Sequence, residues 1–136
     1  MEISDDYLAA CYRDIEALDM KGALIVFGEE LSVREGAMSA APLPPQHYHA
    51  RAEYWLKNNI EDVCKKVHAD PRLRVFILPA THDNVFAGLI EIGKFFEHHI
   101  GVAASADPMS MVGVGYASAL ACKWGFKLLC EIYGGC

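Results

Sequence analysis

The chain has 136 residues, of which 53% are hydrophobic and 22% are charged, and its formal net charge is −6. This length is typical of one compact domain, so we treat residues 1–136 as a single domain. The composition excludes an intrinsically disordered chain, which needs low hydrophobicity and high charge density. The counts of 11 glycines and 6 prolines exclude collagen-like and low-complexity chains.

The negative charge is concentrated near the N-terminus. Residues 1–36 contain nine acidic and three basic side chains, whereas residues 37–136 contain nine of each. Nucleic acids and anionic membranes attract proteins through basic surfaces. We therefore expect neither of them as a partner.

The five cysteines predict free thiols. They are odd in number, widely spaced and without a Cys-x-x-Cys pair, so neither a disulfide framework nor a zinc knuckle is expected. The acidic start of the chain does not resemble a signal peptide, and free thiols without an export signal predict a cytoplasmic protein. The uncharged segment 108–122 is shorter than the roughly 20 residues of a bilayer-spanning helix, and we expect a buried helix there.

The first half of the chain alternates helical and extended patterns. Ser4 begins an amphipathic helix predicted over 5–18, with acidic residues in its first turn. The apolar run 23–27 predicts a strand that is covered on both faces. Residues 29–46 predict a long loop, of a length often used as a lid or a binding loop. Apolar residues at helical spacing predict a helix over 47–67.

The second half continues this alternation. Its predicted elements are helices over 83–99 and 108–124 and strands over 73–78, 102–105 and 127–133. A loop is the alternative for 102–105, and it would leave three strands. The order of elements predicts an α/β fold, a small doubly wound sheet of three to four mainly parallel strands with flanking helices.

The carboxyl ends of the predicted strands mark a candidate active site, because ligands bind there in open parallel sheets. The run from Thr81 to Asn84 also begins a helix, where backbone N–H groups attract anions. His82 changes its charge near neutral pH, which suits proton transfer. The expected site combines His82, Asp83 and Glu29 for catalysis with Arg34, Thr81, Asn84 and His47 for substrate binding.

Two nearby histidines offer a less favoured metal site. His47 and His49 suit one metal ion if their segment is extended, and Glu53, His82 or Glu29 would complete the shell if the fold brings one of them near. Glu53 is favoured among these because it lies four residues after His49. On a helix, however, side chains two residues apart point about 200° apart, and zinc takes three or four ligands. The main expectation is therefore that no metal is bound, and no motif identifies a cofactor.

Small residues follow one another at four-residue spacing on the predicted 108–124 helix, at Gly113, Ala117 and Ala121. Small side chains allow a helix to pack closely against a second element, which is the favoured interpretation of this face. The same face is the expected contact of a homo-oligomer.

Two functions fit these observations. The first is a small cytosolic enzyme that uses acid–base chemistry on a polar, anionic metabolite bound at the strand ends. The second is a non-catalytic ligand-binding or interaction subunit of a larger assembly, with contacts through residues 1–36 or the 108–124 helix. The long loop beside the Thr81–Asn84 run favours the enzyme.

Overall fold

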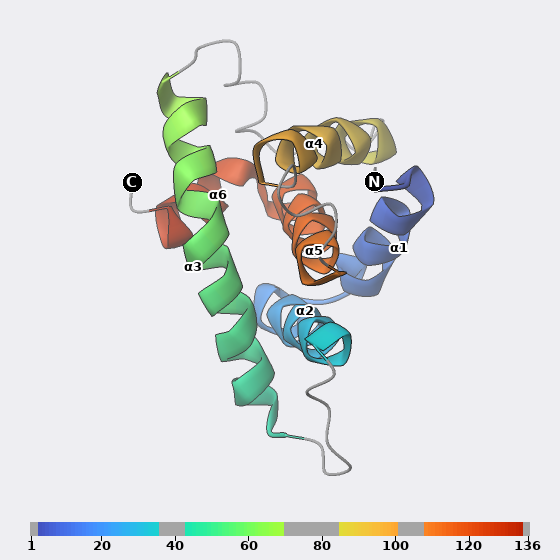
Figure 1. Ribbon diagram of the computed structural model, residues 1–136. Helices are drawn as coiled ribbons and strands as arrows, with labels where there is room; N and C mark the ends of the chain where they lie inside the picture. The colour runs from blue at the N-terminus through green and yellow to red at the C-terminus, as the bar shows by residue number, and fades with distance from the viewer. Residues whose placement is uncertain (1–2, 36–42, 70–84, 101–107, 135–136) are drawn as a thin grey trace.

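Helices make up the regular structure of the described chain (Figure 1). The computed structural model describes residues 3–35, 43–69, 85–100 and 108–134. Its helices are α1 (Asp5–Glu16), α2 (Met20–Glu35), α3 (Pro45–Ala69), α4 (Val85–Ile100), α5 (Pro108–Trp124) and α6 (Phe126–Tyr133). Within these ranges there is no strand, so the predicted α/β class is wrong and the fold is all-α.

The central helix of the bundle is α5 (Figure 1). It contacts each of the other five helices, and residues 112–122 are all buried. A helix that is apolar on every side needs neighbours on every side, which explains its place at the centre. The buried helix predicted over 108–124 is confirmed with the same bounds.

The amphipathic helices predicted over 5–18, 47–67 and 83–99 are confirmed as α1, α3 and α4, to within two residues at each end. The start of α1 illustrates the local cause. The hydroxyl of Ser4 accepts a hydrogen bond from the backbone N–H of Tyr7 at 3.1 Å, and acidic residues occupy the first turn. This cap satisfies a backbone donor that has no partner within the helix.

The first predicted strand, 23–27, lies inside α2, so that prediction is wrong. Asp19 helps to begin the helix, because its Oδ1 atom accepts a hydrogen bond from the backbone N–H of Gly22 at 2.7 Å. Leu24, Phe27 and Leu31 are buried at spacings of three and four residues, which is the spacing of one helix face. A short apolar run alone does not separate a buried strand from a buried helix.

The predicted loop over 29–46 is wrong at both ends. Residues 29–35 belong to α2, and α3 begins at Pro45. The positions 36–42 lie outside the described residues.

The last predicted strand, 127–133, is α6 and is therefore also wrong. Phe126, Leu129, Cys130 and Tyr133 are its buried residues, again at helical spacing. Gly125 separates α6 from α5 with φ at 94°, a conformation that glycine adopts without steric cost. The strands predicted over 73–78 and 102–105 lie outside the described residues.

The small residues of α5 are covered within the chain. A Cβ atom on Gly113 would overlap the indole ring of Trp55 on α3, and one on Gly115 would lie 2.8 Å from the Sγ atom of Cys11 on α1. Close helix packing, the favoured interpretation, is confirmed. A homo-oligomer through this helix is not tested by one chain, and the residues 112–122 that would form it are already buried.

Candidate functional site

The active site predicted at strand ends has no counterpart in the described residues, since these contain no strand. Glu29 is exposed on α2, and Arg34 lies in the last turn of the same helix. His47 is exposed in the first turn of α3. The remaining predicted residues lie outside the described ranges: Thr81, His82, Asp83 and Asn84. The hypothesis of an enzyme that binds its substrate at strand ends is therefore wrong.

A chain of polar side chains connects α3 to α6. The Nδ1 atom of His49 lies 3.1 Å from Oε1 of Glu53, one helical turn away. The hydroxyl of Tyr133 donates a hydrogen bond to Oε2 of the same carboxylate at 3.0 Å. The side chains of His49 and Glu53 are 29% and 37% exposed, whereas Tyr133 is buried. We refer to these three residues as the α3–α6 polar chain.

Glu53 is the centre of this polar chain, because each of its carboxylate oxygens has a partner. Burial raises the pKa of the Tyr133 phenol above its ordinary value, and the hydrogen bond to Glu53 raises it further. Tyr133 therefore remains a protonated donor at neutral pH. The arrangement fixes two helices relative to each other by a charge-assisted hydrogen bond.

The same histidines do not assemble the less favoured metal site. In the part of the chain that the structure describes, no group of three His, Cys, Asp or Glu side chains is placed to hold a metal ion. The ring of His47 packs edge-on against Tyr48, with centroids 5.8 Å apart, while His49 pairs with Glu53. Both histidines lie on one helix, so their side chains diverge as the helical geometry requires.

A second polar contact connects α1 to α5. The hydroxyl of Tyr116 donates a hydrogen bond to Oδ2 of Asp14 at 2.6 Å. The ring of Tyr116 also stacks on Phe27 of α2, with centroids 5.5 Å apart. Burial raises the pKa of this phenol, and the hydrogen bond to Asp14 adds to the rise. Tyr116 thus connects three helices through its ring and its hydroxyl.

Two cysteines outside the disulfide are buried, Cys11 on α1 and Cys122 on α5. Burial raises the pKa of the Cys11 thiol to about 12 and that of Cys122 to about 11. The thiolate is the reactive form of cysteine, so both side chains are poor nucleophiles at neutral pH.

Lys123 closes the C-terminal end of α1. Its Nζ atom donates hydrogen bonds to three backbone carbonyls, those of Ile15 at 3.2 Å, Glu16 at 2.7 Å and Leu18 at 2.5 Å. The last carbonyls of a helix have no partner within the helix and carry partial negative charge. The ammonium group of Lys123, on α5, therefore supplies the hydrogen-bond donors that the backbone carbonyls at the end of α1 need.

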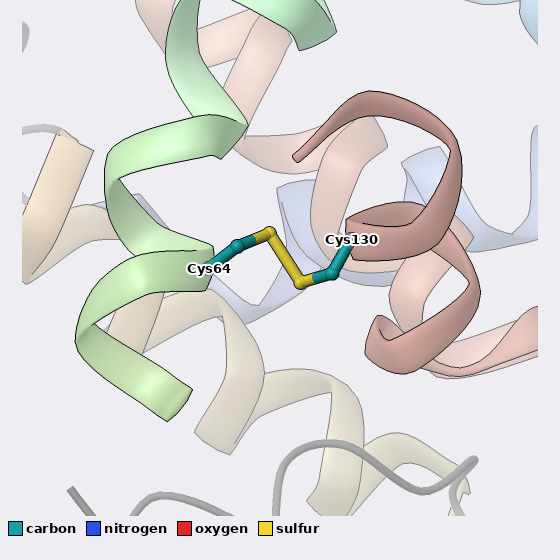
Figure 2. The surroundings of a disulfide bond; sticks show 2 residues. All are labelled: Cys64 and Cys130. Carbon is teal, nitrogen blue, oxygen red and sulfur yellow. A yellow bond between two sulfur atoms is a disulfide. The ribbon is translucent and has the colours of Figure 1, made fainter. Parts of the chain in front are cut away.

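A disulfide connects Cys64 on α3 to Cys130 on α6 (Figure 2). The Cα atoms are 5.7 Å apart, a usual separation for a disulfide, and the two residues are 0% and 2% exposed. The prediction of free thiols is wrong for this pair, while Cys136 lies outside the described residues. The argument from free thiols to a reducing cytoplasm therefore loses its basis.

No described helix is both long enough and apolar enough to cross a membrane. This agrees with the expectation that the uncharged segment 108–122 is too short to span a bilayer.

Sequence reasoning missed the residues that connect the helices, namely Asp14, Cys64, Tyr116, Lys123, Cys130 and Tyr133. Hydrophobic periodicity indicates which positions face inward, but it does not indicate which positions meet. The disulfide, for example, connects positions 66 residues apart. Such pairs become visible only once the packing of the helices is known.

No protein-family model matches the chain, and no curated protein or solved structure matches it either.

Proposed function

We propose that this chain is a non-catalytic helical interaction domain that presents fixed helical surfaces to a protein partner. The observation that carries the proposal is that the polar side chains of this chain bond one helix to another. The groups that resemble catalytic groups, above all Glu53 with Tyr133 and Asp14 with Tyr116, connect one helix to another. A catalytic site needs such groups to converge on a reacting atom instead.

The disulfide supports this proposal because it links α3 covalently to α6 and so restricts how these two helices move relative to each other. It closes a loop between positions 66 residues apart, and in the chain-entropy account a loop of this size stabilises the folded state by about 4 kcal/mol. A rigid surface loses less conformational entropy when it binds, so more of the contact energy appears as affinity. A structural disulfide also favours an oxidising compartment over the reducing cytoplasm predicted from the sequence.

An exposed aromatic side chain provides an anchor for a partner. Tyr54, on α3, is 71% exposed. Tyrosine is among the residues that contribute most to protein–protein affinity, because it buries a large area with little loss of side-chain freedom.

Native mass spectrometry of the oxidised chain, purified without reductant or chelator, tests the proposal. We expect a stoichiometric complex, either with a second copy or with another protein, that can be reconstituted from purified chains. A chain that stays monomeric alone and forms no stoichiometric complex with another protein would contradict the proposal, and so would a monomer that carries only a small molecule. Tyr54→Ala is the surface variant to compare, with far-UV circular dichroism as the control for folding.

A further inference from the structure

The outer face of α3 carries charges of alternating sign. Glu53, Lys57, Glu61 and Lys65 follow one another at four-residue spacing, so they form one ridge along the helix. Lys57, Glu61 and Lys65 are exposed, and the Glu53 side chain is 37% exposed. The ridge is about 18 Å long at the helical rise per residue. Figure 1 shows α3 at the edge of the bundle.

We propose that this ridge, which we call the α3 charge ridge, binds the same ridge of a second copy of the chain in antiparallel orientation. The inference rests on the proposed function and names the partner. In a two-fold arrangement centred between Lys57 and Glu61, Lys57 of each copy faces Glu61 of the other. In the same arrangement, Glu53 of each copy lies near Lys65 of the other. The Glu53 carboxylate already bonds His49 and Tyr133 within its own chain, so the two Lys57–Glu61 contacts are the main charge contacts.

The alternation selects this orientation. The antiparallel arrangement places opposite charges together at all four positions, and a two-fold interface uses the same surface of both copies. Parallel helices in register would place each charge opposite an identical one, which costs free energy. The ridge is therefore complementary to itself in one orientation.

Tyr54 supplies the apolar part of the contact. Charge pairs at the surface contribute little by themselves, so a stable dimer needs buried apolar area as well. Tyr54 is 71% exposed and follows Glu53 at the end of the ridge. In the antiparallel arrangement it lies opposite the Glu61–Lys65 turn of the second copy, where a lysine stem can cover its ring.

A role within one chain is the competing explanation of the ridge. Glu61 and Lys65 already form an ion pair at 3.2 Å within α3, and such pairs stabilise an exposed helix by about 0.3–0.5 kcal/mol. The two roles differ in one consequence, because only the dimer depends on the charges of a second copy.

Charge reversal tests the inference. The variants Lys57→Glu and Glu61→Lys each place like charges opposite one another at two symmetric contacts. By analytical ultracentrifugation at low salt, we expect each variant alone to dimerise about tenfold more weakly than the wild type, or worse. An equimolar mixture of the two variants pairs acid with base at both contacts, so we expect it to recover dimers with one chain of each.

The matched control is Asp62→Lys, which reverses a neighbouring exposed charge on α3 outside the ridge. We expect its dimer affinity to equal that of the wild type within about twofold.

Three results would overturn the inference: a monomeric wild-type chain, single reversals that dimerise like the wild type, or a mixture that does not recover the dimer. If the wild-type chain is monomeric alone but forms a stoichiometric complex with another protein, this inference fails and the proposed function stands. A chain that stays monomeric in both experiments contradicts both.

Discussion

The hydroxyl of Tyr116 shows how one atom can hold two helices. Its hydrogen bond to Asp14 connects α5 to α1, whereas its ring packs on Phe27. The variant Tyr116→Phe keeps the ring and removes only the hydrogen bond. Because a bond to a charged acceptor contributes about 1.5–3 kcal/mol, we expect the free energy of unfolding to fall by an amount in this range. Urea unfolding measures it.

Asp14→Asn is the companion variant, since it keeps an acceptor but removes the charge. We expect Asp14→Asn to lower the free energy of unfolding by less than Tyr116→Phe does. If Tyr116→Phe were as stable as the wild type, the hydrogen bond would have no structural role.

Because the Cys11 thiol is buried, we expect the free energy of unfolding to depend on pH in the alkaline range. Burial raises the pKa of this thiol from 9.0 to about 12. Between these values the unfolded chain loses the proton and the folded chain keeps it. The contribution of Cys11 to stability is therefore complete below pH 9 and is lost as the pH rises towards 12. Each such group lowers the free energy of unfolding by about 1.4 kcal/mol per pH unit in this range.

Urea unfolding of the wild type and of Cys11→Ala, on both sides of pH 9, checks this dependence. Cys122 acts in the same direction, because burial raises its pKa to about 11. We therefore expect the free energy of unfolding to fall with rising pH in both proteins, and to fall less steeply in Cys11→Ala. An equal slope would show that the Cys11 thiol ionises alike in the folded and unfolded chains.

At the scale of helices, Gly113 determines how closely α3 approaches α5. A Cβ atom at this position would overlap the indole of Trp55. We expect Gly113→Ala to lower the free energy of unfolding by about 1–3 kcal/mol, as overpacked cores do.

Gly22→Ala on α2 is the matched control for this substitution. The nearest atom to its new Cβ would be a side-chain oxygen of Asp19 at 3.1 Å. Alanine favours a helix over glycine by about 1 kcal/mol, which offsets that contact. Thermal unfolding of both variants separates packing from helix propensity, and a Gly113→Ala protein as stable as Gly22→Ala would contradict the packing account.

The helices that could be predicted from the sequence are those with local signals. Ser4 marks the start of α1 as its N-cap. In α3 and α4 the apolar residues recur at helical spacing, which identifies both as helices. The central helix α5 could be predicted from its uncharged length and from Pro108 and Gly125 at its ends.

The two helices mistaken for strands lack such clear signals. The run 23–27 of α2 is apolar at every position, which suits a buried strand as well as a buried helix. The prediction over 127–133 placed a strand where α6 lies, although Phe126, Leu129, Cys130 and Tyr133 have helical spacing. The mistaken strands then misplaced the site, because the rule that located it applies only to parallel sheets.

At the scale of the whole molecule, the disulfide contributes a large part of the free energy of unfolding. Small domains are stable by about 5–15 kcal/mol, and closing this loop contributes about 4 kcal/mol in the chain-entropy account. The double variant Cys64→Ala/Cys130→Ala should therefore lose about 4 kcal/mol in urea unfolding. Cys122→Ala is the control, because it removes a buried thiol without removing a disulfide.

The disulfide also gives the most direct test of the fold, because Cys64 and Cys130 meet only if α6 packs on α3 as described. The measurement is peptide mapping by mass spectrometry on chain prepared under oxidising conditions, with thiols alkylated before proteolysis and no reductant added. We expect one linked pair of peptides, with Cys64 in one and Cys130 in the other. Alkylation of both cysteines, or a linkage of either to a different cysteine, would contradict this fold and the interaction domain proposed from it.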